Sequence, residues 1–199
     1  MNLLHVDSSI LGDASASRLL SAQIVERLRR ERPSAEVTYL DLSANPLPHY
    51  SMSSITGSDA VEAAHNAVLL EAFLAADTVV IGVPLYNFAV PSQLKAWIDR
   101  IAIKGRTFRY TANGPEGLVK DKRVIVAIAR GGIYAPGAGT EFAESYLKHF
   151  FGFLGVQDLT FVRAEGLNVS ETHRAASLAA AQDVVATLEA PPQDTALAA

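Results

Sequence analysis

The sequence predicts one doubly wound α/β domain with a five-stranded parallel sheet and helices on both faces. Short apolar segments alternate five times with longer amphipathic segments, and neither a repeat nor a shift in composition interrupts them. Strands and helices that alternate in this way form parallel sheets covered on both sides. The 199 residues suit a single domain, which we expect at residues 1–190, followed by a disordered tail at residues 191–199.

The first two predicted strands enclose one helix. Residues 3–6 form a short apolar run that ends at an aspartate, and they predict a buried strand. Residues 15–32 predict a helix, because apolar residues recur at a spacing of four and Pro33 stops the pattern. Residues 36–40 are rich in β-branched and aromatic side chains and predict the second strand.

The middle of the chain holds the clearest strand. Residues 43–57 contain two prolines and several serines, and we expect a loop there. Residues 59–76 predict a helix that Asp59 caps. Residues 78–83 are apolar at consecutive positions, as expected for a parallel strand buried on both faces. Residues 91–103 predict a helix with a proline at its start.

The C-terminal part continues the alternation after one interruption. Residues 107–118 hold an asparagine-glycine-proline turn signal between two short β-prone pieces. Residues 123–129 and 159–164 predict the fourth and fifth strands. Residues 139–154 and 170–188 predict the last two helices.

Composition excludes several kinds of function. The formal net charge is −4 and no basic stripe is present, which argues against nucleic acid as a partner. The chain has no cysteine, so thiolate nucleophiles, disulfides and zinc–thiolate sites are excluded, and we expect no metal site. The N-terminus has no signal-peptide core, and no apolar run is long enough for a membrane helix. We therefore expect a cytoplasmic protein without a membrane partner.

Three loops at one edge of the predicted sheet have unusual sequences. Doubly wound sheets bind ligands beyond the carboxyl ends of their strands, where the strand order reverses. The loop after the first strand carries three hydroxyls, Ser9, Ser15 and Ser17, at the start of a helix. Amides at a helix N-terminus attract anions, and hydroxyls donate to phosphate oxygens. A serine-rich turn that only caps the helix is the alternative. Arg18 could assist a phosphate, but we expect it to be exposed.

The loop after the third strand is apolar, although loops at this edge are usually polar. Leu85, Tyr86 and Phe88 surround a single Asn87. These residues offer a wall for a flat heteroaromatic ring and an amide for its polar edge. A hydrophobic lid packed on a neighbouring helix is the alternative explanation.

The loop after the fourth strand begins at Ala129 and continues through Arg130, Gly131 and Gly132. Paired glycines let backbone amides approach a ligand closely. Such donors stabilise negative charge on a bound ring. A tight turn without a ligand is the alternative here. Each loop has an explanation without a ligand. We expect all three to lie at one edge, where a single ligand would touch them, and this combination favours a ligand site.

Several motifs together carry a resemblance to a known family. In chain order they are Ser8-Ser9-Ile10-Leu11, Ser15-Ala16-Ser17, Pro84-Leu85-Tyr86-Asn87-Phe88, Thr107-Phe108-Arg109-Tyr110, Asn113-Gly114-Pro115-Glu116-Gly117-Leu118, Arg130-Gly131-Gly132, and Phe161-Val162 with Ala164-Glu165-Gly166. Through these motifs, residues 2–187 resemble the bacterial FMN-dependent NADH:azo and quinone reductases. Residues 107–118 are the most specific part, since general α/β architecture does not require them.

The resemblance implies a flavodoxin-like fold with strand order 2-1-3-4-5 and a homodimer with FMN sites near the subunit interface. It implies FMN as the prosthetic group, NADH or NADPH as the donor, and quinones and azo compounds as acceptors. It assigns the cofactor contacts to Ser9, Ser15, Ala16 and Ser17, to Leu85, Tyr86, Asn87 and Phe88, and to Ala129, Arg130, Gly131 and Gly132. It also implies an aromatic substrate pocket, for which the candidates are Phe108, Tyr110, Phe150 and Phe151.

Two departures from the family pattern concern specificity. Ala129 stands where the family often has serine, so one side-chain donor is missing. The loop at residues 46–58 is shorter than in well-known members, which leaves open both the choice between NADH and NADPH and the choice of substrate.

The sequence contains neither a nucleophile-elbow motif nor a metalloprotease motif. We therefore expect flavin-based chemistry with no catalytic side chain. A ping-pong cycle is expected, in which the nicotinamide leaves before a quinone or azo compound takes its place, and azo cleavage would need two rounds. Two other interpretations stay open: a flavodoxin-type electron carrier for a protein partner, and a flavin-free binding or signalling module.

Overall fold

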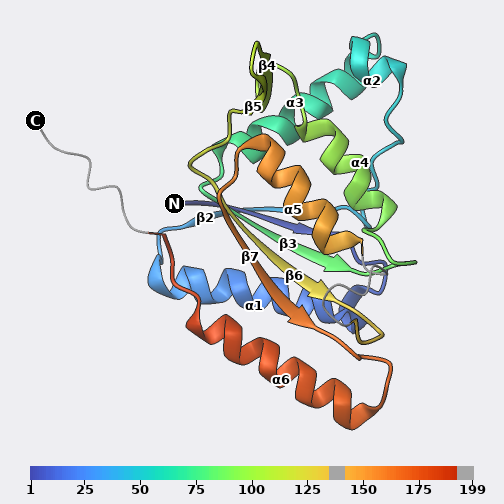
Figure 1. Cartoon of the computed structure of the whole chain (residues 1–199), viewed down its shortest axis with the longest axis vertical. Helices are drawn as coiled ribbons and strands as arrows, with labels where there is room; N and C mark the ends of the chain where they lie inside the picture. Colours follow the sequence, from blue (N-terminus) through green and yellow to red (C-terminus); the bar gives the residue numbers. More distant parts are fainter. Residues whose placement is uncertain (135–141, 192–199) are drawn as a thin grey trace, which may run out of the picture.

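A computed structural model describes residues 1–134 and 142–191 of the chain. The parallel strands are β1 (Asn2–Asp7), β2 (Glu36–Asp41), β3 (Thr78–Pro84), β6 (Arg123–Ala129) and β7 (Asp158–Ala164). They form one five-stranded sheet in the order β2-β1-β3-β6-β7 (Figure 1). Because β6 and β7 are the fourth and fifth strands of this sheet, the predicted order 2-1-3-4-5 is confirmed.

Helices cover both faces of the sheet. The helices α1 (Ala16–Glu31) and α6 (Glu171–Thr187) pack on one face (Figure 1). The helices α3 (Ala60–Ala75), α4 (Ser92–Ile101) and α5 (Ala143–Leu154) pack on the other. None of the helices that the structure describes is both long and apolar enough to cross a lipid bilayer.

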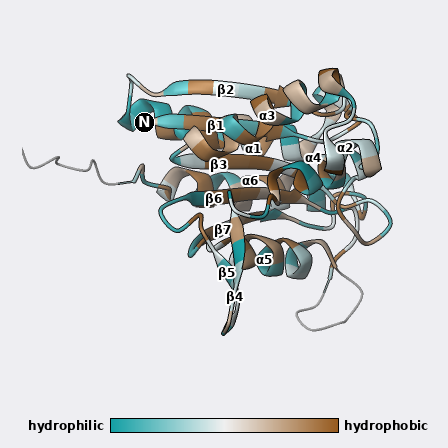
Figure 2. Cartoon of the chain, turned by 90° about the horizontal axis from the view of Figure 1, so that it is seen from above, coloured by the Kyte–Doolittle hydropathy of each residue, from teal (hydrophilic) through white to brown (hydrophobic). Residues whose placement is uncertain are grey.

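The sheet separates two hydrophobic cores. Every residue of β3 is buried, and Figure 2 shows this strand in the apolar colour. Successive side chains of a strand point to opposite faces, so Val80 packs under α1 while Val79 and Ile81 face α3 and α4. In the larger core the rings of Phe73 and Trp97 meet edge to face, with centroids 5.9 Å apart. This contact joins α3 to α4 on that face of the sheet.

A hairpin projects from the domain at the opposite end from the carboxyl ends of the central strands (Figure 1). Its strands are β4 (Phe108–Thr111) and β5 (Gly114–Gly117), which pair antiparallel around the predicted turn. A Cβ atom on Gly117 would lie 2.2 Å from the backbone of Leu154 at the end of α5. Only glycine therefore lets the hairpin pack this closely. The turn between two short β-prone pieces is confirmed.

The structure differs from one predicted segment, and two others lie partly outside the described residues. The segment expected to be a loop at residues 43–57 contains a short helix, α2 (Met52–Thr56), so that prediction is wrong. Ser51 and Ser54 form a reciprocal capping box that starts α2, and Gly57 ends it at a φ of 66°. The expected helix at residues 139–154 is described only from Ala143, because residues 135–141 lie outside the described part. The expected tail also lies outside it, apart from Pro191.

Candidate functional site

The three predicted loops follow the carboxyl ends of β1, β3 and β6, where the strand order reverses. The amide of Leu85 donates to the carbonyl oxygen of Ala129 at 2.8 Å, which ties the second loop to the third. The hydroxyl of Tyr86 lies 3.2 Å from Ser9 Oγ, and it accepts from the amide of Ile10 at 3.3 Å. The structure thus brings all three loops to one edge of the sheet.

The first loop ends in a pair of buried hydroxyls. Ser15 is the N-cap of α1, and its Oγ lies 3.1 Å from Ser17 Oγ. The amide of Arg18 donates to Ser15 Oγ at 3.3 Å. The amides of Ala16 and Ser17 have no hydrogen-bond acceptor among the described residues. Two hydroxyls and two available amides therefore meet at the N-terminus of a 16-residue helix, where the helix dipole favours an anion.

The second loop is strained. Asn87 and Phe88 have φ angles of 46° and 69°, in the left-handed region that favours glycine. Reciprocal hydrogen bonds between the backbones of Tyr86 and Ala89, at 3.0 and 3.1 Å, hold this turn. The amides of Asn87 and Phe88 have no acceptor within residues 1–134 and 142–191. Backbone strain of this kind clusters at ligand sites.

The third loop is fixed by the loop that follows β7. The carbonyl groups of Arg130, Gly131 and Gly132 accept from the amides of Leu167, Asn168 and Gly166. A Cβ atom on Gly131 would lie 2.5 Å from the side-chain nitrogen of Asn168, so a larger residue there would displace the Asn168 side chain. In the part of the chain that is described, the amides of Gly131 and Gly132 have no acceptor. They are available to a ligand at this edge.

Arg130 braces the third loop with both its side chain and its backbone. Its side chain is 5% exposed, and Nη2 donates to Glu144 of α5 at 2.9 Å. It also pairs with Glu165 after β7, and its amide donates to the carbonyl oxygen of Ala164. Hydrogen bonds from Arg163, Lys148 and Arg130 lower the pKa of Glu144 to about 2. The geometry therefore gives Arg130 a structural role beside the available glycine amides.

The four aromatic candidates for a substrate pocket lie in different surroundings. Phe151 is 0% exposed in the core under α5, so its prediction as a pocket residue is wrong. Phe150 is half-buried and stacks on Tyr146 with centroids 6.2 Å apart. Phe108 and Tyr110 belong to the hairpin, which lies away from the three loops in Figures 1 and 2. One chain alone does not bring them together with the loops.

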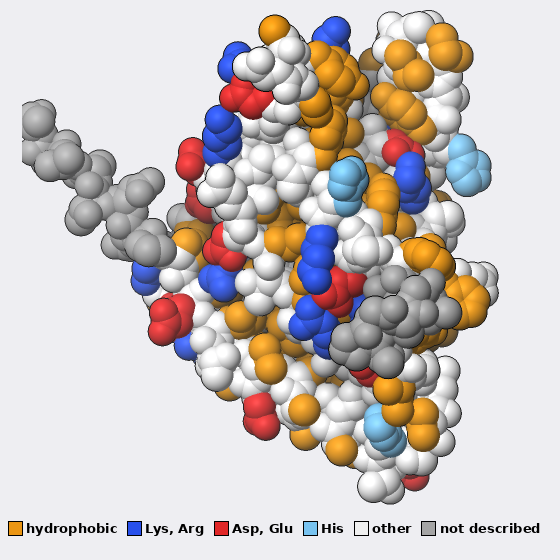
Figure 3. Space-filling view, viewed as in Figure 1, with side chains coloured by type: hydrophobic (Ala, Val, Ile, Leu, Met, Phe, Trp, Pro, Cys, Tyr) orange, Lys and Arg blue, Asp and Glu red, His pale blue; other side chains and the backbone are white. Residues whose placement is uncertain are grey.

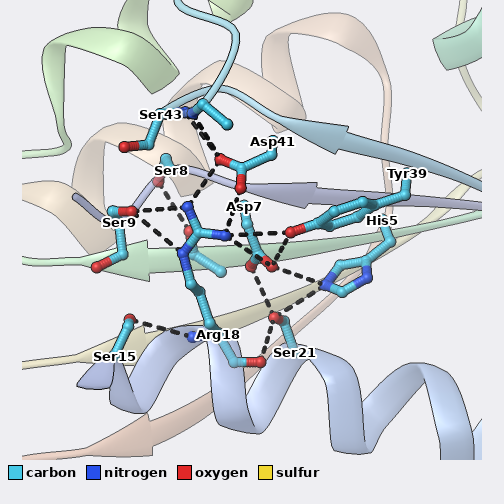
Figure 4. Close-up of polar contacts among 12 residues, drawn as sticks. His5, Asp7, Ser8, Ser9, Ser15, Arg18, Ser21, Tyr39, Asp41 and Ser43 are labelled. Carbon is cyan, nitrogen blue, oxygen red and sulfur yellow. Dashed lines mark hydrogen bonds and ion pairs between the residues drawn. The ribbon is translucent and has the colours of Figure 1, made fainter. Parts of the chain in front are cut away.

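A buried polar network lies beneath the first loop and was not predicted (Figure 4). Asp7 ends β1, is 2% exposed, and accepts from Ser21 Oγ at 2.8 Å and from the Tyr39 hydroxyl at 3.1 Å. His5 Nε2 lies 3.3 Å from the same carboxylate. A Cβ atom on Gly82 would lie 2.2 Å from Asp7 Oδ1, so the adjacent strand needs glycine.

Arg18 belongs to this network, and the expectation that it is exposed is wrong. Its side chain is 16% exposed and forms a bidentate pair with Asp41 at the end of β2, with both N–O distances at 2.7 Å. This hydrogen bonding lowers the pKa of Asp41 to about 2. Tyr39 is 50% exposed, but desolvation of its hydroxyl, together with the charge of Asp7, raises its pKa to about 12. The available sequence signal was an aspartate at the end of each of two neighbouring strands.

These features fit a mononucleotide that carries a flat ring. The hydroxyls and amides of the first loop suit a phosphate, and the strained second loop places an exposed aromatic ring and an amide side chain nearby. No cluster of potential metal ligands occurs among the described residues. The first loop also lacks the lysine of nucleotide-hydrolysing P-loops. Fold and site together define a doubly wound α/β protein of the class that has a candidate nucleotide site at the carboxyl edge of its sheet.

The chain belongs to the family with the flavodoxin-like fold, whose model matches residues 1–188. It is 56% identical over 181 residues to an FMN-dependent NADH:quinone oxidoreductase of Xanthomonas oryzae pv. oryzae, covering 91% of this chain and 93% of that protein. It is 51% identical over 201 residues to FMN-dependent NADH:quinone oxidoreductase 2 of Bradyrhizobium diazoefficiens, covering 96% of this chain and all of that protein. The resemblance found in the sequence is confirmed.

Solved structures agree with this assignment. The azoreductase of Bacillus anthracis strain Sterne superposes with a TM-score of 0.84 at 30% identity, covering 94% of this chain and 100% of that one. An FMN-dependent NADH-azoreductase of the Ames Ancestor strain, solved in complex with FMN, gives a TM-score of 0.84 at 28% identity and covers 94% and 96% of the two chains.

Proposed function

We propose that this protein is an FMN-dependent oxidoreductase that passes two electrons from NADH to quinones and also reduces azo compounds. One observation carries the proposal. Three pairs of available amides, with the hydroxyls of Ser15 and Ser17, gather at the sheet edge of a chain whose relatives are named for FMN and NADH:quinone chemistry. The loops proposed to bind the phosphate, the ring and the edge of the ring are hydrogen-bonded to one another at this edge.

The proposed contacts follow from the geometry of each loop. Ser15 and Ser17, with the amides of residues 16 and 17, would hold the phosphate at the N-terminus of α1, where the helix dipole favours negative charge. Ser9 lies beside them, hydrogen-bonded to Tyr86. The second loop, residues 85–88, would bind the ring through its apolar side chains and the side-chain amide of Asn87. The amides of the third loop would bind the opposite edge of the ring.

When bound, FMN supplies the two-electron redox chemistry that the side chains of this cysteine-free chain do not offer. The chain's own residues would bind the cofactor and orient it relative to the substrate. The amides of Gly131 and Gly132 are placed to stabilise negative charge on the ring edge. The exposed ring of Phe88, with 53% of its surface accessible, forms one wall beside which a flat substrate can stack.

We further propose a ping-pong order, because donor and acceptor are both flat and would use the same slot in turn. Reductive cleavage of an azo bond would then require two rounds with NADH. Initial rates measured at several fixed quinone concentrations should give parallel lines in a double-reciprocal plot. Lines that converge would contradict the shared slot. The same assay run with NADPH establishes the preferred nicotinamide.

The most direct test of the function is an absorbance spectrum of the purified protein during titration with NADH under nitrogen. We expect a yellow protein whose flavin band bleaches with NADH and returns when a soluble quinone is added. A colourless protein that takes up no added FMN would overturn the proposal and favour the flavin-free binding module.

The electron-carrier alternative predicts a strongly acidic docking face. On the face shown in Figure 3, acidic side chains of the described residues are scattered among basic ones. The whole chain has 21 acidic and 17 basic residues, which is a small bias. Oxidation of NADH by the pure protein with a soluble quinone and no second protein separates the enzyme from the carrier.

We also propose that the protein works as a homodimer whose substrate pocket is completed by the second copy. Tyr110 is 65% exposed at the projecting hairpin, far from the loops of its own chain. An aromatic side chain so placed can cover a ring only in a neighbouring subunit. The proposal accounts for both the exposed hairpin and the family motif at residues 107–118.

A further inference from the structure

Arg18 joins three separate parts of the chain (Figure 4). It lies in the first turn of α1, and its Nε and Nη2 donate to the carbonyl oxygen of Ser9 at 3.1 and 2.8 Å. Its Nη1 and Nη2 donate to the two carboxylate oxygens of Asp41, both at 2.7 Å. Nη1 also donates to the Tyr39 hydroxyl at 3.1 Å. The guanidinium therefore connects the first loop, the first helix and the edge strand β2.

These hydrogen bonds use every N–H of the guanidinium. A guanidinium has five donors, and the five contacts to Ser9, Asp41 and Tyr39 match them one for one. The charge of Arg18 is neutralised by Asp41 at 2.7 Å. In this arrangement Arg18 has no donor left for a phosphate on the other side of the loop, so any effect on phosphate binding must act through Ser9.

Apart from Arg18, the start of the first loop is held by the Tyr86 hydroxyl, which contacts Ser9 Oγ at 3.2 Å and the amide of Ile10 at 3.3 Å. The short 3-10 helix within it, η1 (Gly12–Ala14), contains no buried residue. Ile10 and Leu11 are 59% and 57% exposed, so the turn has no apolar anchor of its own. Polar bonds at Ser9 therefore carry much of the restraint. Fixing a carbonyl with a charged fork is both strong and directional.

Asp41 is itself held in place. Its Oδ1 accepts from the amides of Ser43 and Ala44, both at 3.0 Å, in the turn after β2. These two bonds orient the carboxylate independently of Arg18. An edge strand pairs on one side only, and this pair ties the end of β2 to α1. The two charged residues are thus joined to each other and to the backbone on both sides.

We propose that Arg18 and Asp41 form a clamp that presets the loop at residues 9–17 for the phosphate group of the flavin nucleotide. Arg18 is a positioning residue in this proposal and does not touch the ligand. The proposal rests on the proposed function, since the phosphate belongs to FMN. Without the clamp the loop samples other conformations, and the free energy needed to order it then weakens phosphate binding.

The test compares two flavins that differ only in the phosphate. Arg18→Met removes all five hydrogen bonds but keeps an unbranched apolar stem. Dissociation constants of FMN and riboflavin are measured by quenching of flavin fluorescence on titration with the apoprotein. We expect FMN to bind about tenfold more weakly or worse, a change of about 1.4 kcal/mol. Riboflavin should bind the variant as it binds the wild type, because it has no phosphate.

Two further variants sharpen the comparison. Arg123→Met is the matched control, because the Arg123 side chain is also 16% exposed and pairs with Asp158 at the other end of the sheet. It should leave both flavin constants unchanged. Arg18→Lys should fall between wild type and Arg18→Met, since one ammonium cannot form the fork. If Arg18→Met does not fold, Asp41→Asn tests the same clamp while keeping an oxygen for the turn amides.

The outcomes separate the clamp from the function itself. Equal weakening of FMN and riboflavin in Arg18→Met would show general damage and overturn the clamp. Unchanged FMN binding in that variant would also overturn it, while leaving the proposed function intact. A wild-type protein that binds neither flavin would overturn the proposed function first.

Discussion

At the residue scale, two serines with similar burial have different tasks. Ser15 caps α1 through the amide of Arg18, whereas Ser17 Oγ contacts only Ser15 Oγ within the described residues. We expect Ser17→Ala to weaken FMN binding about tenfold with little change in Tm, because it removes a ligand donor and no cap. Ser15→Ala should lose both the ligand donor and the helix cap, and loss of the cap should lower the free energy of unfolding by about 1 kcal/mol. Flavin titration and thermal melts measure the two effects, and full FMN affinity in Ser17→Ala would refute the proposed phosphate contact.

Gly82 shows how a single missing side chain supports the polar network. A Cβ atom there would lie 2.2 Å from Asp7 Oδ1 and 3.2 Å from the carbonyl oxygen of Ser17. Gly82→Ala should therefore lower the free energy of unfolding by roughly 1–3 kcal/mol, as measured by denaturant titration. Gly152→Ala is the control, because a Cβ atom there meets nothing within 4 Å and the site is helical. The control should be neutral or slightly stabilising; equal stability of both variants would contradict the argument.

At the element scale, carboxylates join neighbouring elements and make stability depend on pH. Glu144 of α5 pairs with Arg130 after β6 and Arg163 of β7, and its pKa is lowered from 4.5 to about 2. The folded pKa is the lower one, so the stabilisation is complete above about pH 5 and is lost as the pH falls towards about 2. Asp41 shifts in the same direction. Urea titrations between these pH values should show this loss.

Glu144→Gln gives the control for that prediction. The variant should be less stable than the wild type near pH 7, because Arg130 and Arg163 lose a charged partner. Its stability should also fall less on acidification, since the main shifted carboxylate is gone. A variant that matches the wild-type pH profile would place the effect on other carboxylates.

At the scale of the whole molecule, the hairpin lies too far from its own loops to serve them. We expect analytical ultracentrifugation to find a dimer and Tyr110→Ala to raise the KM for quinone several-fold. FMN affinity should stay as in the wild type, because the three loops of each chain hold the cofactor. A monomer with full activity would contradict the shared pocket. Arg109 and Glu116 pair across the hairpin, so Tyr110→Ala should leave its shape unchanged.

Much of the fold could be predicted from sequence because its signals are local. Runs of buried residues in β1, β3 and β6 and the fourfold spacing in α1 follow directly from burial on one or both faces. The three loops could be placed at one edge because parallel strands end on the same side. The helix α2 was missed because its capping box uses two serines, in place of the usual serine and glutamate.

The sequence by itself determined the alternation of strands and helices, the positions of the three loops and the family motifs. Only the tertiary structure decided that Arg18 is held by Asp41, that Arg130 braces its loop, and that Phe151 is core. Each of these depends on residues far apart in the chain that meet only when the sheet forms. Periodicity shows which face a residue occupies, but the residues it contacts on that face are determined by the packing of the whole domain.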